Sequence, residues 1–303
     1  MNVIALVWDF DKTLVDGYMQ DPIFRRFNID SSAFWTTVNG LPKKYLEEQG
    51  VAVNPDTIYL NEFIRYARSG KLAGLNNDML KDFGRELCFY RGVPEIFDAT
   101  KAVIEEDPAY REYGIEVEHY IVSTGMKKVI EGSTVMQKVK RIWGCEFIEE
   151  ELDGNPIISE IGYTIDNTTK TRALFEINKG VGIGDRDGVD VNTSIPEDQR
   201  RVKFNHMIYI ADGPSDIPSF SLVNKNGGAT FAVYPKGNIE ALRQVERMRK
   251  DGRVNMYAEA DYSEDTTAYL WLREKVREFA NEIRNSERTK LMNSKSDSPR
   301  HLV

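Results

Sequence analysis

Four short, uninterrupted runs of apolar residues constrain the fold of this chain more than any other feature. The runs are Val3–Trp8, Tyr120–Val122, Met207–Ala211 and Ala229–Tyr234. A continuous apolar run with polar residues on either side predicts a strand that is buried on both faces. Segments with helical periodicity, such as 93–106 and 238–249, lie between the runs. This alternation predicts a doubly wound, Rossmann-like parallel sheet with helices on both faces.

Composition narrows the class of protein. The 303 residues include 40 basic and 48 acidic ones, a formal net charge of −8. A dedicated nucleic-acid binder would present a basic face, and a membrane helix would need about 18 consecutive apolar residues. Neither is present, and no basic segment precedes the first apolar run as it would in a secretory signal. We therefore expect a cytoplasmic protein whose partners include neither nucleic acid nor membrane.

The few histidines and cysteines bear on the choice of metal. With two cysteines and three histidines, the chain offers little for a zinc site or a disulfide framework. Any bound metal is expected to have oxygen ligands.

Two segments depart from the alternation of strands and helices. Residues 16–91 contain amphipathic helical stretches and no buried strand, which predicts a mainly helical domain inserted between 1–15 and 92–285 of the core. Residues 145–163 contain two apolar runs around Asp153-Gly154, a pattern typical of a β-hairpin.

The C-terminal region divides into two parts. Apolar residues at 268, 272, 276, 279 and 283 predict a helix with one packed face. Residues 286–303 are polar and serine-rich, and we expect them to form a disordered tail.

Two carboxylates follow the first apolar run directly, in the sequence Asp9-Phe10-Asp11-Lys12-Thr13. Residues two apart in an extended segment point to the same side, so Asp9 and Asp11 face the same way. The carboxyl ends of parallel strands form the edge where open α/β sheets bind ligands. Acidic residues after a strand often only begin a turn, but two like charges this close are costly unless a cation lies between them.

Two later runs also end in residues suited to a phosphate or a metal. Ser123, Thr124 and Gly125 follow the second run, although taken alone they are better explained as a helix N-cap. Asp212 follows the third run, and Asp216 lies at the start of the next helix. Taken alone, these two are a turn residue and a helix N-terminal charge. Because parallel strands bring their ends to one edge, the joint pattern predicts an oxygen-only cluster suited to Mg²⁺.

These motifs resemble those of the haloacid dehalogenase-like (HAD) superfamily, in particular its phosphatases similar to phosphoserine phosphatase. The resemblance covers the chain from Asp9 to about Tyr234, with the helical insertion at 16–91 in the position of that family's cap. It rests on aspartate-X-aspartate-X-threonine and on the later aspartate-glycine-X-X-aspartate, each after a strand. It implies a HAD-like core and a Mg²⁺-dependent phosphoric monoester hydrolase.

The resemblance also implies a role for each aspartate. Asp9 would be the nucleophile that becomes an aspartyl phosphate. Asp11 would act as general acid for the leaving group and then as general base for water. The Asp9 carboxylate, the Asp11 backbone carbonyl and Asp212 would bind Mg²⁺, with Asp216 in support.

The phosphoryl group would be held by Ser123 or Thr124, next to Gly125. The resemblance also requires a lysine that neutralises the phosphoryl charge. Lys170, at a helix start, is our choice, although it lies further from the late aspartates than the family pattern suggests. Lys203 is closer in sequence and is the competitor. Either lysine could equally be a solvated surface charge.

Two departures from the family pattern need an explanation. Lys12 stands where many relatives have glycine. The spacing of the predicted lysine is explained if 180–201, which is rich in glycine and includes Asp185 and Asp187, is an insertion. Its glycine spacing fits neither an EF-hand nor a dinucleotide-binding loop, so we expect a mobile hairpin near the site.

The leading hypothesis is a phosphatase that acts on a small phosphorylated metabolite. A phosphotransferase or mutase on the same fold is the nearest rival, and a non-catalytic protein that binds a phosphate ligand is the alternative from another class. The cap is expected to select the substrate. Its early aromatic residues are Tyr18, Phe24, Phe27, Phe34, Trp35 and Tyr45. Most of them are expected to form the core of the cap, and one or two, which the sequence does not identify, to line the pocket. The sequence does not indicate an oligomeric state.

Overall fold

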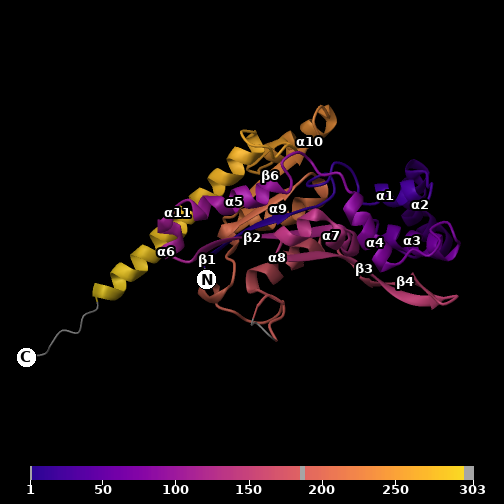
Figure 1. Cartoon of the computed structure of the whole chain (residues 1–303), viewed down its shortest axis with the longest axis horizontal. Coiled ribbons are helices and arrows are strands. Elements are labelled where there is room, and N and C mark those ends of the chain that lie inside the picture. The colour runs from indigo at the N-terminus through magenta and orange to yellow at the C-terminus, as the bar shows by residue number, and fades with distance from the viewer. Residues whose placement is uncertain (1, 185–187, 297–303) are drawn as a thin grey trace, which may run out of the picture.

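A seven-stranded sheet forms the centre of the molecule, whose computed structural model describes residues 2–184 and 188–296 (Figure 1). The strand order is β4-β3-β2-β1-β5-β6-β7, and all neighbours are parallel except β3 and β4. The strands are β1 (Asn2–Trp8), β2 (Ile115–Met126), β3 (Arg141–Leu152), β4 (Asn155–Tyr163), β5 (Met207–Ala211), β6 (Ala229–Tyr234) and β7 (Met256–Glu259). The predicted doubly wound parallel sheet is confirmed.

Helices cover both faces of the sheet. Those of the core are α5 (Glu95–Glu105), α6 (Pro108–Glu112), α7 (Lys127–Gly132), α8 (Thr169–Lys179), α9 (Ile217–Lys225), α10 (Ile239–Lys250) and α11 (Thr267–Ser296). Short 3₁₀ turns occupy 134–138, 197–199, 204–206 and 214–216. Right-handed crossovers place α5 on one face and α9 and α10 on the other, because they connect strands on opposite sides of β1. The helices α6 and α11 pack against α5, and α8 packs against α9.

The first apolar run becomes the central strand. Residues 3–8 of β1 are all buried, and β1 pairs with both β2 and β5. Asp9 therefore follows a strand that is covered on every side. Its backbone N–H donates to the carbonyl of Ile210 at 2.9 Å, which continues the ladder between the two strands. The nucleophile predicted from the sequence thus lies at the middle of the sheet edge.

The predicted insertion is helical. It contains α1 (Asp21–Arg26), α2 (Ser31–Gln49), α3 (Ile58–Arg68), α4 (Asn77–Phe83) and a 3₁₀ turn at 84–86. We call residues 16–91 the cap; its exact boundaries stay a prediction. Figure 1 shows α1 to α4 grouped at one end of the molecule.

The predicted hairpin at 145–163 is also confirmed, as β3 and β4. Its turn residues Asp153 and Gly154 have φ angles of 51° and 77°, as a type I′ turn requires. The hairpin extends beyond the sheet and contacts the cap. The N–H of Ile158 donates to the carbonyl of Leu75 at 2.9 Å, and Arg68 of α3 donates to the carbonyl of Ser159 at 3.3 Å.

The C-terminal helix is longer than expected. Positions 268, 272, 276, 279 and 283 are buried, as the periodicity predicts. The expectation of a disordered tail at 286–303 is wrong for 286–296, because α11 continues to Ser296; residues 297–303 lie outside the described part. An established helix adds residues at little cost, and Glu287 and Lys290 form an ion pair along it at 2.7 Å. Within the described residues, no helix is long and apolar enough to cross a membrane.

The glycine-rich segment at 180–201 lies at the amino ends of the strands, because α8 carries the chain away from the carboxyl edge. Arg201 forms a buried, bidentate ion pair with Glu118, near the start of β2, with one N···O distance of 2.5 Å. Arg141, the first residue of β3, donates to the carbonyl of Val181. The segment is therefore attached to the end of the sheet opposite the aspartates.

The expectation of a hairpin near the site is wrong on both points. The described residues of this segment contain no strand, and their anchors lie far from Asp9 along β2. Asp185 and Asp187 fall outside the described residues. Asp190 accepts hydrogen bonds from the N–H groups of Asn192 and Thr193 at 2.8 Å, which makes a local turn.

Candidate active site

Asp9 and Asp11 lie at the carboxyl end of β1. Asp9 is only 6% exposed, and burial raises its pKa to about 6 against the opposing attraction of Lys170. Burial, and then the charge of Asp9, raises the pKa of Asp11 well above its usual range. One oxygen of Asp11 accepts the backbone N–H of Met19 at 2.9 Å, which ties the first cap residues to the motif.

Lys170 lies among the aspartates. Its side chain is 1% exposed, and Nζ lies 2.8 Å from Oδ1 of Asp9 and 2.6 Å from Oδ1 of Asp216. Burial alone would lower the pKa of Lys170, but the two carboxylates outweigh it and raise the pKa well above its usual value. The loop before α8 is held by Asp166, which accepts the N–H of Thr169 at 2.7 Å. Lys170 is thus fixed in the first turn of the helix.

Lys203 lies elsewhere. Lys203 lies just before the 3₁₀ turn at 204–206, which leads into β5. It is therefore at the amino end of β5, whereas Asp212 follows the carboxyl end of the same strand. Burial, together with the charge of Lys203, lowers the pKa of the nearby His206 to about 4. The structure therefore separates Lys203 from the cluster and brings Lys170 into it.

Asp216 is fully buried at the start of α9, and its carboxylate accepts three hydrogen bonds. Its Oδ1 accepts from Lys170 and, at 2.6 Å, from the hydroxyl of Tyr209 on β5; its Oδ2 accepts from Ser215 at 2.8 Å. A carboxylate has about four lone-pair sites, so Asp216 has little capacity left for a metal. Its contacts suit a supporting role that fixes the lysine.

Three carboxylates converge closely enough to share an ion. Oxygen atoms of Asp9, Asp212 and Asp216 lie within 4.8 Å of one another. Burial and the charges of Asp9 and Asp216 raise the pKa of Asp212 to about 7, so Lys170 alone does not compensate the negative charge of the cluster. An all-oxygen, electron-rich donor set of this kind fits a hard divalent cation such as Mg²⁺.

The residues predicted to hold a phosphate lie at the end of β2, the strand next to β1. Ser123 is 2% exposed, and its Oγ accepts the N–H of Gly125 at 3.0 Å. Because the oxygen is engaged as an acceptor, the hydroxyl proton remains available for a ligand. Thr124 is partly buried, and no partner of its hydroxyl is found among the described residues. The backbone then enters α7 at Lys127.

Met19 connects the two motifs. Its thioether accepts the N–H of Met126 at 3.0 Å, while its own N–H binds Asp11. A Cβ at Gly125 would lie 2.1 Å from Cε of Met19, so a side chain at that position would displace the methionine. Glycine at position 125 therefore lets the first cap residues pack directly over the end of β2.

Lys12 has a left-handed backbone, with φ of 56°. This conformation favours glycine, which explains the glycine of the family pattern at this position. The N–H of Lys12 donates to the carbonyl of Gly17 at 3.1 Å, and Nζ lies 4.2 Å from the centre of the Tyr18 ring and donates to its hydroxyl. Lys12 therefore combines a strained backbone with contacts to Gly17 and Tyr18 at the start of the cap.

Three further hydrogen bonds among the described residues join the cap to the site, in addition to those of Gly17, Tyr18 and Met19. The hydroxyl of Tyr59, on α3, donates to the carbonyl of Thr124 at 2.9 Å. In the loop before α8, Asp166 accepts from the side chain of Asn54 at 2.9 Å. The N–H of Asn167 in that loop donates to the cap residue Asp56 at 3.2 Å. The cap therefore contacts both the phosphate-binding strand and the loop that precedes Lys170.

Three buried polar atoms of the cap have no hydrogen-bond partner among the described residues: Oε1 of Gln20, Nε1 of Trp35 and Oδ1 of Asn77. The Trp35 ring lies between Tyr18 and Tyr59, with ring centres 6.1 and 5.9 Å away. Phe24 and Phe34 are buried in the cap, which agrees with the expectation that most of its early aromatic residues form its core. Unpartnered buried atoms are rare. Gln20 follows Met19, and Trp35 packs against Tyr59, so these two are the candidates for a contact with a ligand, whereas Asn77 contacts the hairpin.

The predicted residues largely meet, and the structure adds others. Tyr209, Tyr59 and Met19 were not predicted as site residues. A buried tyrosine within an apolar strand needs a partner for its hydroxyl, and this signal was available for Tyr209. No comparable signal exists for Tyr59 or Met19, because their contacts depend on how the cap folds back. The residues that the structure brings to one edge are Asp9, Asp11, Ser123, Thr124, Gly125, Lys170, Asp212 and Asp216.

Among solved structures, proteins of similar fold are found. No model of a known protein family matches the chain. A HAD-family hydrolase from Salmonella enterica serovar Typhi has a similar structure, with a TM-score of 0.52 and 13% identity over 90% of this chain and 71% of that one. A phospho-aspartyl intermediate analogue of phosphoserine phosphatase is 14% identical over 85% of this chain and 93% of that one, with a TM-score of 0.46.

One relative is much closer in sequence. An uncharacterised protein of Borreliella burgdorferi is 34% identical over 289 residues, which cover 91% of this chain and 97% of that protein. The chain therefore belongs to the same family as the Borreliella burgdorferi protein, and its fold is that of the haloacid dehalogenase-like superfamily.

Proposed function

We propose that the chain is a Mg²⁺-dependent phosphatase that hydrolyses a small phosphomonoester through a phospho-aspartate. The observation that carries the proposal is the position of Lys170, whose ammonium bridges Asp9 and Asp216 while Asp212 lies within reach of the same oxygens. A carboxylate nucleophile, a fixed cation and a set of metal ligands are the components that phosphoryl transfer requires.

The Asp9 and Asp212 carboxylates and the backbone carbonyl of Asp11 would hold Mg²⁺, which would neutralise charge on the transferring phosphoryl group. Lys170 neutralises charge from the other side. The Ser123 hydroxyl, whose oxygen already accepts from Gly125, donates to a phosphoryl oxygen.

In the first step, an Asp9 oxygen attacks phosphorus. Oδ1 is held by Lys170, whereas Oδ2 has only a long contact of 3.5 Å with the Thr13 hydroxyl, so we assign the attack to Oδ2. The bond from Oδ2 to phosphorus forms as the ester bond breaks, and Asp11 gives its proton to the departing oxygen. In the second step Asp11 takes a proton from water, which attacks phosphorus, releases phosphate and restores Asp9.

The leaving group would meet the cap. Gln20 Oε1 could accept, and Trp35 Nε1 could donate, a hydrogen bond to a substrate that replaces their missing partners. A small metabolite with both donor and acceptor groups fits this pair. The Tyr18 and Tyr59 rings on either side of Trp35 would shield it from water.

Turnover of a generic aryl phosphate tests the proposal. We expect hydrolysis with Mg²⁺, its loss on chelation and its return when the metal is restored. Asp9→Asn should abolish turnover, because the amide is not a nucleophile. The same chemical change at the exposed hairpin turn, Asp153→Asn, should leave the rate unchanged.

The alternatives give different results in the same experiment. Transfer of phosphate to an added alcohol faster than to water would identify a phosphotransferase. An absence of turnover across a broad panel of phosphorylated metabolites, combined with measurable phosphate binding, would rule out the phosphatase and favour the binding protein.

A further inference from the structure

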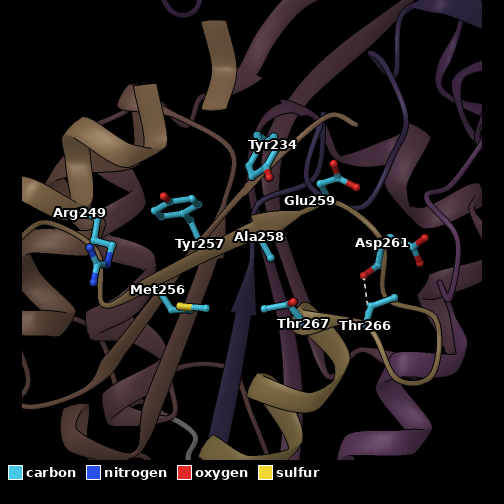
Figure 2. Close-up of a pocket in the computed structure, with 9 residues that line it drawn as sticks. All are labelled: Tyr234, Arg249, Met256, Tyr257, Ala258, Glu259, Asp261, Thr266 and Thr267. Carbon is cyan, nitrogen blue, oxygen red and sulfur yellow. Dashed lines mark hydrogen bonds between the residues drawn. The ribbon is translucent and has the colours of Figure 1, made fainter. Parts of the chain in front are cut away.

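The sheet ends at β7, and a groove of about 710 Å³ runs along this edge (Figure 2). The backbone N–H of Asn255 donates to the carbonyl of Thr230 beside β6 at 3.1 Å. Successive N–H groups of a strand point to opposite sides, so those of Met256 and Ala258 point outward. Among the described residues, no strand pairs with this edge.

Apart from its shortness of four residues, the edge lacks the features that usually protect one. The strand Met256–Glu259 contains no proline and no lysine, and its ladder with β6 has no register shift. Met256 and Tyr257 are only partly buried. Leu270, three residues after Thr267 on the helix beside the groove, is 53% exposed. An apolar, unprotected edge of this kind favours pairing with another strand.

Charges at the two ends of the groove are opposite. Arg249, in the last turn of α10, lies at one end, and Glu259 lies toward the other, where Asp261 also lines the groove, as Figure 2 shows. Asp261 pairs with Arg91, whereas Arg249 and Glu259 have no ion-pair partner within the part of the chain that the structure describes. A two-fold axis through the middle of β7 would bring Arg249 of one copy opposite Glu259 of the other, twice in each pair.

We propose that the β7 edge is the interface of a homodimer, in which β7 of two copies pair antiparallel and extend the sheet across both molecules. We assign a second copy of this chain as the partner, because a two-fold axis places the positive end of one groove opposite the negative end of the other. A stable interface buries about 1,200–2,000 Å² in total, more than two short strands supply, so the flanking surfaces of α10 and α11 must also take part. The proposal does not depend on the phosphatase activity.

Sedimentation equilibrium of the full chain tests the pairing. We expect a reversible monomer–dimer equilibrium in the micromolar range. Arg249→Glu and Glu259→Arg should each weaken dimerisation roughly tenfold or more, because each places like charges opposite each other at two points. The double variant restores both ion pairs with the two charges exchanged. Its dissociation constant should therefore return close to that of the wild type.

A backbone variant provides an independent test. Met256→Pro removes an outward N–H and none of the bonds to β6, and proline is tolerated at a free strand edge. We expect a monomer with unchanged circular dichroism and unchanged aryl phosphate turnover. A wild type that is monomeric up to high concentration would overturn the proposal. So would a dimer that Met256→Pro leaves intact, or a double charge variant as weak as the single ones.

Discussion

Lys170 contacts two buried carboxylates at once, and this determines what its loss would do. Replacing one partner of a buried ion pair typically costs about 3–5 kcal/mol, because a charge remains without compensation. We expect Lys170→Met to lower the free energy of unfolding by an amount of this order. Loss of a donor to the transition state typically lowers turnover by about 10²–10³. Urea unfolding and aryl phosphate hydrolysis measure the two effects.

The matched control is Lys203→Met, which removes the same charge at the opposite end of β5. It should leave turnover within a factor of about two, since it contacts none of the aspartates. If Lys203→Met were the more damaging change, the assignment of Lys170 would be wrong.

The left-handed backbone of Lys12 leads to a second prediction. A residue with a Cβ in this conformation costs about 1–2 kcal/mol relative to glycine. Lys12→Gly and Lys12→Ala both remove the contact with Tyr18, but only glycine relieves the backbone. We expect the glycine variant to have a free energy of unfolding about 1 kcal/mol higher than that of the alanine variant, measured in urea. Equal stability would show that position 12 is unstrained.

Between elements, the contact of α3 with the end of β2 is open to a conservative test. Tyr59→Phe removes one hydroxyl, whose hydrogen bond to the Thr124 carbonyl is worth about 1 kcal/mol, or about fivefold in rate if it positions the phosphate site. We expect kcat/KM for an aryl phosphate to fall by about that factor.

Tyr66→Phe, on the same helix, is the control for this change. Tyr66 packs its ring against Phe34, and its hydroxyl makes no hydrogen bond to the core within the described residues, so turnover should be unchanged. Equal effects of the two variants would contradict a positioning role for Tyr59.

A helix or strand can be predicted from sequence when its own residues carry the pattern that defines it. The runs that became β5 and β6 were predicted to the residue, because strands buried on both faces leave a continuous apolar pattern. The edge strand β7 was missed, since its apolar run, Met256 to Ala258, has only three residues and none of them is β-branched. The position of 180–201 was misjudged because the segment follows Lys170 closely in sequence. The helix α8 separates them in space, since it leads the chain away from the site.

The same distinction holds for the site. The aspartates follow their strands directly, so a local motif combined with the rule for parallel strands predicts their meeting. Tyr59 and Thr124 are 65 residues apart, and their contact depends on how the cap packs on the core. No local sequence pattern predicts how the cap packs on the core. The cap contacts therefore had to come from the structure.

For the molecule as a whole, His119 predicts a dependence of stability on pH. It lies in the core between β1 and α5, where Nδ1 accepts from Trp8 at 3.1 Å and Nε2 lies 3.2 Å from the carbonyl of Phe97. Burial, assisted by the charge of Lys101, lowers its pKa to about 3. The folded protein therefore keeps His119 neutral while the unfolded chain takes up a proton below a pH of about 6.5.

Stability from this group is fully present above about pH 6.5 and falls as the pH is lowered toward 3, by about 2 kcal/mol at pH 5. His119→Gln can keep both hydrogen bonds without a titrating group. We expect the free energy of unfolding in urea to fall more steeply between pH 7 and 5 in the wild type than in this variant. Parallel slopes would contradict the prediction.

The central place of β1 has a consequence for synthesis. This strand is made before its two neighbours in the sheet, which begin at Ile115 and Met207. At about 5–20 residues per second, the ribosome needs roughly 10–40 s to reach the second of them. For that time one or both edges of an entirely apolar strand have no partner. Nascent chains that stop before β5 should therefore be the forms of this protein most in need of chaperones.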